Sequence, residues 1–204
     1  MLIAPVLASA TLAAVQPPVA PAMTAIDAER AFAADAQRVG QWTAFKKWST
    51  PDAMMFVPQP VNANDFLKAK ADPPVAVFWW PGKSFVSCDG KTAINTGPWV
   101  REWGKSVGYF TTVWKRQPDG GWKWVYDAGD ALKQPRAEGG DIQPVVATCN
   151  GKQTLVPHSH WSEDRTLAWT NIIGPQGQRS FFVWLWTGEK YENVISDQFA
   201  APLK

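Results

Sequence analysis

Asp127 is the acidic residue whose position best suits acid–base chemistry, because it lies in the most regular strand pattern of the chain. A carboxylate in such a strand must find a hydrogen-bonding partner, or desolvation raises its pKa. Strict alternation along the strands places Tyr109, Thr111 and Asp127 on one face. Two roles stay open for Asp127: a structural hydrogen bond, to a helix end or to an arginine such as Arg30 or Arg38, and a part in a binding or catalytic site.

Metal-dependent and nucleophilic chemistry have weaker signals. The two histidines, His158 and His160, would share one face of a strand, and Glu163 or Asp164 could add an oxygen ligand. A stable metal site needs three or four ligands, and nothing fixes the others, so we expect a solvated strand end and no metal. The sequence also lacks a glycine-rich phosphate loop, a Gly-x-Ser-x-Gly motif and a Cys-x-x-Cys motif, and we expect no cofactor.

The two cysteines lie in similar segments, Cys88-Asp89-Gly90-Lys91 and Cys149-Asn150-Gly151-Lys152. Each precedes a pair of residues that favours a two-residue hairpin turn. A disulfide between them would close a loop of about 60 residues and contribute roughly 4 kcal/mol on the chain-entropy model. Two separate buried thiols are the alternative, and the sequence leaves both open.

The elements that must position these residues begin with three helices. Thr24 is a candidate N-cap with Asp27 in capping-box position, and Gly40 is placed to end the helix. A second helix presents Trp42, Phe45 and Trp48 at i+3 spacing before Thr50-Pro51 stops it. A short strand at Met54–Val57 follows. Asn62 then caps a third helix, which is expected to end near Lys70.

Strand patterns begin at Val75 and lead to a hairpin closed by Gln117-Pro118-Asp119-Gly120-Gly121. This loop predicts that Arg116 faces Trp122, Trp114 faces Trp124 and Thr112 faces Tyr126. Residues 131–142 are polar and glycine-rich, which indicates a connector. The predicted strands before the hairpin are Val75–Trp80, Lys83–Cys88 and Lys91–Trp103. The predicted strands after the connector are Gln143–Cys149, Lys152–Trp161, Arg165–Ile173, Gln178–Thr187 and Lys190–Phe199. The pattern predicts an α+β fold with helices on one face of a curved antiparallel sheet, and a C-terminal antiparallel β-meander packed on that sheet.

Composition excludes some classes of partner. The 204 residues carry a net charge of +2 without basic runs, which argues against nucleic acid. The 13 tryptophans lie mostly in strand patterns and are more typical of core and interface packing than of a row of stacking platforms.

Residues 1–22 have features of an export signal. Leu2 to Val15 is apolar or small throughout, and Ala20-Pro21-Ala22 is a small-x-small cleavage site, although no Lys or Arg precedes Arg30. The apolar run is too short for a comfortable membrane span, so we expect no stable membrane insertion. A disordered cytoplasmic tail is the alternative. The favoured interpretation is a periplasmic or secreted protein.

Several motifs resemble a domain-of-unknown-function branch of the nuclear transport factor 2-like, or SnoaL-like, superfamily, over about residues 24–130. They are Glu29-Arg30-Ala31-Phe32-Ala33, Val61-Asn62, Asn95-Thr96-Gly97-Pro98-Trp99, Val113-Trp114-Lys115-Arg116-Gln117-Pro118-Asp119-Gly120 and Trp122-Lys123-Trp124-Val125. The resemblance implies a cone, in which the curved sheet wraps the three helices around an apolar pocket, often in a homodimer. The superfamily includes isomerases that use an Asp base beside a Tyr and a second, protonated acid. Tyr109 and Asp127 match two of these parts by analogy only, and no second acid matches.

The sequence therefore predicts an export signal at 1–22, a cone domain at 23–130, a connector at 131–142 and a β extension at 143–204. We expect the cone to bind a small apolar or aromatic molecule. Catalysis of the isomerase or cyclase type, with Asp127 and Tyr109 as catalytic residues, is one alternative. A dimerisation or interaction module without a ligand, built on the aromatic hairpin face, is the other. The face opposite Trp114 and Trp124 is expected to line the pocket, whose residues would be Trp42, Phe45, Trp99, Tyr109, Thr111 and Asp127.

Overall fold

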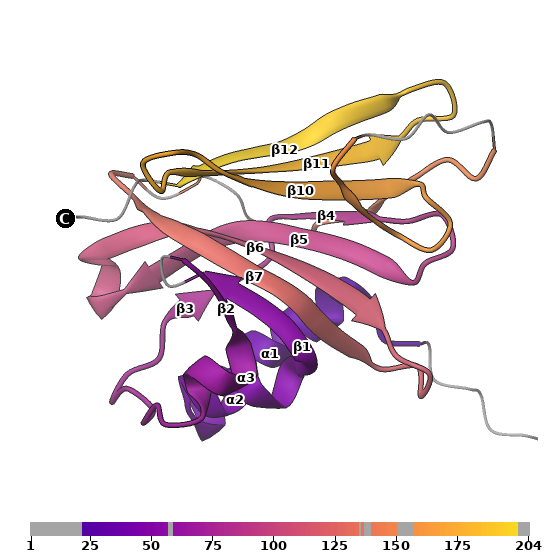
Figure 1. Cartoon of the computed structure of the whole chain (residues 1–204). Coiled ribbons are helices and arrows are strands. Elements are labelled where there is room, and N and C mark those ends of the chain that lie inside the picture. Colours follow the sequence, from indigo (N-terminus) through magenta and orange to yellow (C-terminus); the bar gives the residue numbers. More distant parts are fainter. Residues whose placement is uncertain (1–21, 57–58, 135, 137–139, 151–156, 200–204) are drawn as a thin grey trace, which may run out of the picture.

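The structure is a computed structural model that describes residues 22–56, 59–134, 136, 140–150 and 157–199. It has three layers: a layer of helices, a mixed first sheet and an antiparallel second sheet (Figure 1). The predicted export signal lies outside the described residues except for Ala22. The helical elements are α1 (Ala25–Val39), α2 (Gln41–Trp48), α3 (Ala63–Leu67) and the 3₁₀ turn η1 (Glu102–Gly104).

The first sheet has the strand order β2-β1-β7-β6-β5-β4-β8, with β3 also paired to β5. Its strands are β1 (Ser49–Phe56), β2 (Pro60–Asn62), β3 (Phe78–Trp79), β4 (Lys83–Val86), β5 (Thr92–Arg101), β6 (Ser106–Arg116), β7 (Trp122–Leu132) and β8 (Val145–Val146). The second sheet has the order β12-β11-β10-β9. Its strands are β9 (His160–Trp161), β10 (Leu167–Ile173), β11 (Arg179–Trp186) and β12 (Tyr191–Phe199).

The helix caps form as the sequence predicts. The Thr24 hydroxyl accepts from the backbone N–H of Asp27, and the Asp27 carboxylate accepts from the backbone N–H of Thr24, so the capping box is complete. Gly40 ends α1 with a φ of 106°, a conformation that glycine adopts without strain. Asn62 caps α3, although this helix ends at Leu67, earlier than expected.

The central hairpin β6–β7 closes through the predicted loop. Gln117 N–H donates to the Gly121 carbonyl at 2.8 Å, and Gly120 has a φ of 84°. The register is confirmed for Arg116–Trp122 and Trp114–Trp124. It then shifts, so that Val113 lies opposite Tyr126 and Thr112 opposite Asp127. The predicted pairing of Thr112 with Tyr126 is therefore wrong.

A β-bulge causes this shift. β7 has one residue more than β6 between Trp124 and Tyr126, and such an extra residue reverses the alternation of side chains beyond it. Tyr126 consequently packs toward the second sheet, where its ring stacks on Phe181 at 4.5 Å. Asp127 moves to the helix-facing side, which it shares with Trp114.

The first sheet is mixed, so the prediction of a purely antiparallel sheet is wrong in part. β1 runs parallel to β7, and β8 runs parallel to β4. Parallel neighbours cannot be joined by a tight turn, and both pairs are distant in the sequence, so no hairpin signal marks them. The short β8 also places Val145 and Val146 in the first sheet rather than in the C-terminal meander. Much of the predicted strand before His160 lies outside the described residues.

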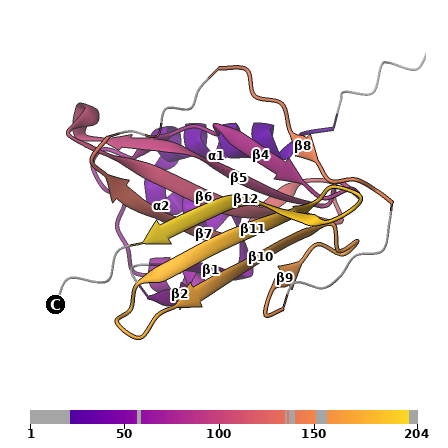
Figure 2. The same ribbon diagram turned by 90° about the horizontal axis from the view of Figure 1, so that it is seen from above.

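Both faces of the first sheet are covered. Helix residues such as Phe32 and Ala36 pack on one face, with Trp114 and Trp124 of the hairpin. The second sheet packs on the other face (Figure 2). Val113 and Tyr126 of the first sheet share a core there with residues of the second sheet such as Phe181. Among the described residues, both faces of the β6–β7 hairpin are thus used within the chain. The aromatic hairpin face of Trp114, Trp122 and Trp124 is buried within the chain, so this face is not open to a partner.

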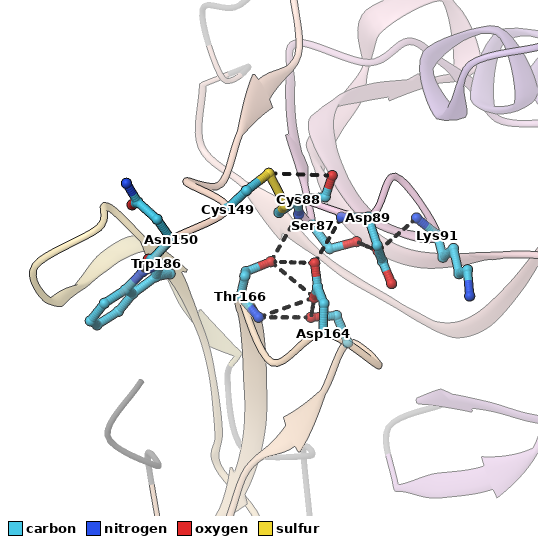
Figure 3. The surroundings of a disulfide bond; sticks show 10 residues. Ser87, Cys88, Asp89, Lys91, Cys149, Asn150, Asp164, Thr166 and Trp186 are labelled. Atoms are coloured by element: carbon cyan, nitrogen blue, oxygen red, sulfur yellow. Dashed lines mark hydrogen bonds between the residues drawn. A yellow bond between two sulfur atoms is a disulfide. The ribbon is translucent and has the colours of Figure 1, made fainter. Parts of the chain in front are cut away.

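A disulfide joins the β4–β5 turn to the segment that follows β8. Cys88 and Cys149 are bonded, with their Cα atoms 5.2 Å apart, which decides between the two alternatives that the sequence left open (Figure 3). The same turn contacts the start of β10 through hydrogen bonds. Cys88 N–H donates to Thr166 Oγ1 at 2.9 Å, and Asp89 N–H donates to Asp164 Oδ2 at 2.7 Å.

Among the described residues, no helix is both long and apolar enough to cross a membrane. Within the same part of the chain, no three His, Cys, Asp or Glu side chains are grouped so that they could hold a metal ion.

Candidate functional site

A cavity of about 340 Å³ lies between the helices and the helix-facing side of the first sheet. Its lining combines aromatic and aliphatic side chains with a few polar groups. The lining residues are Phe32, Gln41, Trp42, Phe45, Met55, Val77, Trp79, Trp99, Arg101, Ser106, Phe110, Asp127, Ala128, Gly129, Asp130 and Ala131. An apolar wall with a small number of polar groups is the usual composition of a small-molecule site, and this volume is near the lower end of the common range of about 300–1,000 Å³.

The sheet side of the cavity is formed by the indole of Trp99, which lies over glycine on the neighbouring strand. A Cβ atom at Gly108 would come within 2.3 Å and 2.4 Å of two ring carbons of Trp99. One strand further, a Cβ atom at Gly129 would lie 3.5 Å from Trp99 Nε1. Because neither glycine has a side chain, the indole lies close against the sheet. The structure thereby settles which face of the sheet Trp99 occupies, which the sequence could not fix.

The helix side of the cavity is a cluster of aromatic rings in edge-to-face contact. The ring of Phe32 lies 4.8 Å from those of Phe45 and Trp79, and the rings of Trp42 and Phe45 are 5.5 Å apart. These residues come from α1, α2 and β3. Such pairs add to the free energy of burial, so this wall is fixed before any ligand binds.

Asp127 is the acid of the cavity. Thr112 Oγ1 donates to Asp127 Oδ2 at 2.7 Å, and no ion pair to Asp127 exists among the described residues. The residue lies deep in the protein, and the part of its surface that stays accessible faces the cavity. Burial raises the pKa of Asp127 to about 7, against the opposing effect of the Thr112 hydrogen bond. The carboxyl group can therefore give or accept a proton near neutral pH.

A second acid, Glu29, lies behind the aromatic wall. It is fully buried in α1 and does not line the cavity. Its carboxylate accepts from Trp79 Nε1 at 2.9 Å, from Trp114 Nε1 at 2.7 Å and from Asn95 Nδ2 at 3.3 Å. Burial raises the pKa of Glu29 to about 7; these donors lower it, and the charge of Asp127 adds to the increase.

Glu29 was missed as a functional candidate, although its position carries a signal. It falls within the apolar stripe of α1, between Ala25 and Phe32, where an acid has no route to solvent. Gly108 and Gly129 were missed as well. An isolated glycine inside a strand often marks a close approach to the backbone, and the pair could have been found on that ground.

Two polar side chains complete the lining. Gln41 is held in place because its Oε1 accepts from the backbone N–H of Val77 at 3.0 Å. Arg101 is exposed, and its guanidinium carbon lies 5.4 Å from the centre of the Trp99 ring. Alternation along β5 places Trp99 and Arg101 on the same side of the sheet.

The structure brings together four of the six predicted pocket residues: Trp42, Phe45, Trp99 and Asp127 all line the cavity. Tyr109 and Thr111 lie on the opposite face of the sheet. Tyr109 Oη donates to the Gln198 carbonyl at 2.7 Å, and Thr111 Oγ1 donates to Asp197 Oδ2 at 2.6 Å.

The prediction that the face opposite Trp114 and Trp124 lines the pocket is therefore wrong, because the helices cover the Trp114 side and the cavity lies there. The prediction that the three polar residues share one face is wrong as well, because the bulge in β7 moves Asp127 to the Trp114 side. A Tyr109–Asp127 pair cannot act on one substrate in this cavity. The arginines considered as structural partners lie elsewhere as well: Arg38 forms its ion pair with Asp35 at 2.6 Å.

Comparison with solved structures finds proteins of similar fold. A nuclear transport factor 2-like (NTF2-like) superfamily protein from Salmonella enterica serovar Typhimurium is 14% identical, with a TM-score of 0.39, over 57% of this chain and 94% of that chain. A protein of unknown function from the DUF3225 family of Pectobacterium atrosepticum is 12% identical, with a TM-score of 0.39, over 52% of this chain and 89% of that chain.

A cystatin-like fold protein from Burkholderia xenovorans is 14% identical, with a TM-score of 0.42, over 54% of this chain and 91% of that chain. No protein-family model matches the chain, and no curated protein matches it. Each of the three structural matches covers little more than half of this chain.

Proposed function

We propose that this protein binds a small apolar or aromatic molecule in the cavity between its helices and its first sheet. The observation that carries the proposal is the composition of the lining: a fixed aromatic wall and the Trp99 indole surround one acid, Asp127. Apolar surface supplies most of the binding free energy, and a few polar groups fix the orientation of the ligand. Asp127 is the polar anchor, because it is the deep titratable group of the lining.

Filling the cavity tests this function. N-phenyl-1-naphthylamine, a neutral probe whose fluorescence rises in apolar surroundings, serves as the ligand. Val77→Trp places a large side chain in the lining, and Ala131→Trp does so at a second position that needs less rearrangement. Val75→Trp is the matched control, because Val75 is 65% exposed and lies outside the lining.

We expect both lining variants to weaken probe binding by about tenfold or more, and the control to bind like the natural protein. Circular dichroism and the melting temperature confirm that each variant is folded. Equal affinity in all four proteins would contradict binding in this cavity.

One observation favours a second function, acid–base catalysis by Asp127. Its pKa of about 7 is suited to proton transfer at neutral pH, and the group faces a cavity. Exchange of the hydrogens next to the carbonyl of 4-phenylbutan-2-one in D₂O, followed by NMR, measures such a transfer. Asp127→Asn should abolish the exchange, whereas Asp119→Asn, at an exposed loop acid, should not. Equal exchange with and without the protein would end this alternative.

We further propose that the protein is exported and works in an oxidising compartment. The export-signal pattern supports this location, and the Cys88–Cys149 disulfide fits it, because disulfides persist mainly outside the cytoplasm. Mass spectrometry of the protein from its native host should show a chain that starts at or near Met23. Intact residues 1–22 in a cytoplasmic fraction would contradict export.

A further inference from the structure

We infer that the ligand of this cavity is an aromatic anion, held with its ring system on the indole of Trp99 and its anionic group at Arg101. The inference deepens the proposed function and rests on it. It adds a charge and an orientation to a ligand that was so far defined only as small and apolar or aromatic.

The cavity lining carries charges of both signs. Its titratable residues are Arg101, Asp127 and Asp130. The Asp130 carboxylate belongs to the other side of the sheet, because it interacts electrostatically with Tyr109 and Arg179 between the two sheets. Its Oδ1 also accepts from the N–H of the following residue at 2.8 Å. The cavity therefore presents one cation, Arg101, and one deep acid, Asp127.

Neither of these two groups is neutralised by the protein. Throughout the part of the chain that the structure describes, Arg101 forms no ion pair, and its guanidinium group contacts the Trp99 ring. Within the same residues, Asp127 forms no ion pair and one side-chain hydrogen bond, with Thr112. A guanidinium group is a planar fork that matches a carboxylate in bidentate geometry, so Arg101 is suited to bind an anionic ligand group.

The surface next to Arg101 is the indole of Trp99. The Trp99 indole lies over Gly108 and toward Gly129, and the guanidinium carbon is 5.4 Å from the ring centre. A flat ring that packs on the indole would thus have the guanidinium group at its edge. The rings of Phe45 and Trp79 on the helix side enclose the same space, which favours an aromatic over a branched aliphatic ligand body.

The deep acid sets the orientation of the ligand. An anionic group next to Asp127 would place two like charges in a water-poor environment, which is unfavourable. The anionic group therefore lies at Arg101, in the exposed part of the lining, and a neutral hydrogen-bonding group such as a hydroxyl lies at Asp127. The expected class of ligand is an aromatic acid with a polar substituent at the far end.

The experiment compares 4-hydroxycinnamate with its uncharged amide, 4-hydroxycinnamamide, by isothermal titration calorimetry. The two compounds share the ring, the length and the hydroxyl group and differ in charge. The proteins are the natural chain, Arg101→Gln and Lys105→Gln. Lys105 is the matched control: it is an exposed basic residue of the same hairpin, and it does not line the cavity.

We expect the natural protein to bind the acid at least tenfold more tightly than the amide. Arg101→Gln should remove that difference by weakening the acid alone, and Lys105→Gln should change either affinity by less than twofold. Similar affinities for acid and amide, or an Arg101→Gln variant that keeps the difference, would overturn the inference and leave the proposed function standing.

Two further outcomes are also decisive. If neither cinnamate binds but the neutral naphthylamine probe does, the inference is overturned and the cavity takes a neutral ligand. If all three compounds fail to bind the folded natural protein, the proposed function fails together with the inference.

Discussion

The indole N–H of Trp79 donates a hydrogen bond of 2.9 Å to Oε1 of Glu29, across the interface between β3 and helix α1. Through this bond a fully buried acid holds a residue of the cavity wall. The same carboxylate accepts from Trp114 on β6 at 2.7 Å and from Asn95 on β5 at 3.3 Å, so one side chain connects the first helix to three strands of the sheet. The shape of the cavity therefore depends on a residue that does not line it.

Replacing Glu29 by Gln should destabilise the protein most at low pH. The amide keeps one acceptor oxygen but puts an NH₂ group where an indole N–H points, and an unsatisfied buried donor costs about 1–3 kcal/mol. At pH 5 we expect the free energy of unfolding to fall by about 2 kcal/mol. At pH 8 the loss should be smaller, because burial raises the pKa of Glu29 to about 7 and the natural protein is itself weakened above it. Urea unfolding at both pH values measures this, with Glu189→Gln as the exposed control.

The pH dependence of the natural protein follows from Asp127 and Glu29 together. Both have a pKa of about 7 in the folded state, above the ordinary values of 3.8 and 4.5. Between these limits the folded protein binds more protons than the unfolded chain, so the free energy of unfolding falls as the pH rises. The stability that the neutral acids confer is complete below about pH 4 and is lost as the pH passes 7.

Asp127→Asn isolates the contribution of that residue. Each unit of pKa is worth about 1.4 kcal/mol, and solvent in the cavity screens part of the charge. Relative to that of the natural protein, we expect the free energy of unfolding of the variant to rise by about 2 kcal/mol from pH 4 to pH 8. Denaturant unfolding across this range gives the difference. If the difference in the free energy of unfolding between the two proteins does not change with pH, Asp127 keeps an ordinary pKa.

The parts of the fold that sequence reasoning found are those with local signals. Thr24 and Asp27 predict a cap because both partners lie within one turn of helix. Gln117 and Gly121 predict a hairpin because the loop between them carries its own turn chemistry. Neither conclusion requires knowledge of a distant segment.

The parts that it missed depend on contacts between distant segments. The bulge between Trp124 and Tyr126 has no local marker, yet it decides that Asp127 rather than Tyr126 faces the cavity. The parallel pairing of β1 with β7 joins strands that are far apart in the sequence. Four pocket residues could be named from their chemistry. Tyr109 and Thr111 were misplaced because the sequence does not tell which face of the sheet the helices cover, and the extra residue in β7 separates Asp127 from them.

Gly108→Ala should disturb the cavity through Trp99. The new Cβ atom would lie 2.3 Å from a ring carbon of Trp99 and 2.1 Å from the Asp130 carbonyl oxygen, so both the indole and the backbone of β7 must move. Strain of this kind typically costs about 1–3 kcal/mol. We expect a lower melting temperature and weaker binding of the naphthylamine probe. Gly121→Ala is the control, because its new Cβ would contact only the flexible Asp119 side chain. Equal effects of the two variants would contradict the close contact of Trp99 with the sheet.

The Cys88–Cys149 disulfide should contribute substantially to stability. The cysteines are 61 positions apart, and closing a loop of about this length is worth roughly 4 kcal/mol on the chain-entropy model. We expect the double variant Cys88→Ser, Cys149→Ser to lose a free energy of this order in urea unfolding. Thr166→Val, which removes the hydroxyl that accepts from Cys88 N–H and donates to Asp164 at the same junction, should lose only about 2 kcal/mol. Two free thiols in the denatured, unreduced natural protein would show that the bond does not form.

Phe181→Ala should lower the stability of the whole chain in a single transition. Phe181 belongs to the second sheet, is fully buried and stacks on Tyr126 of the first sheet at 4.5 Å. Truncating a buried phenylalanine costs about 3–5 kcal/mol.

Because the second sheet buries Tyr126 and Val113, loss of the second sheet would expose an apolar face of the cone. Removing residues 135–204 should accordingly give insoluble protein. Two separate transitions in the Phe181→Ala variant, or a soluble fragment 23–134 that unfolds cooperatively, would show that the cone folds independently of the strands that cover it.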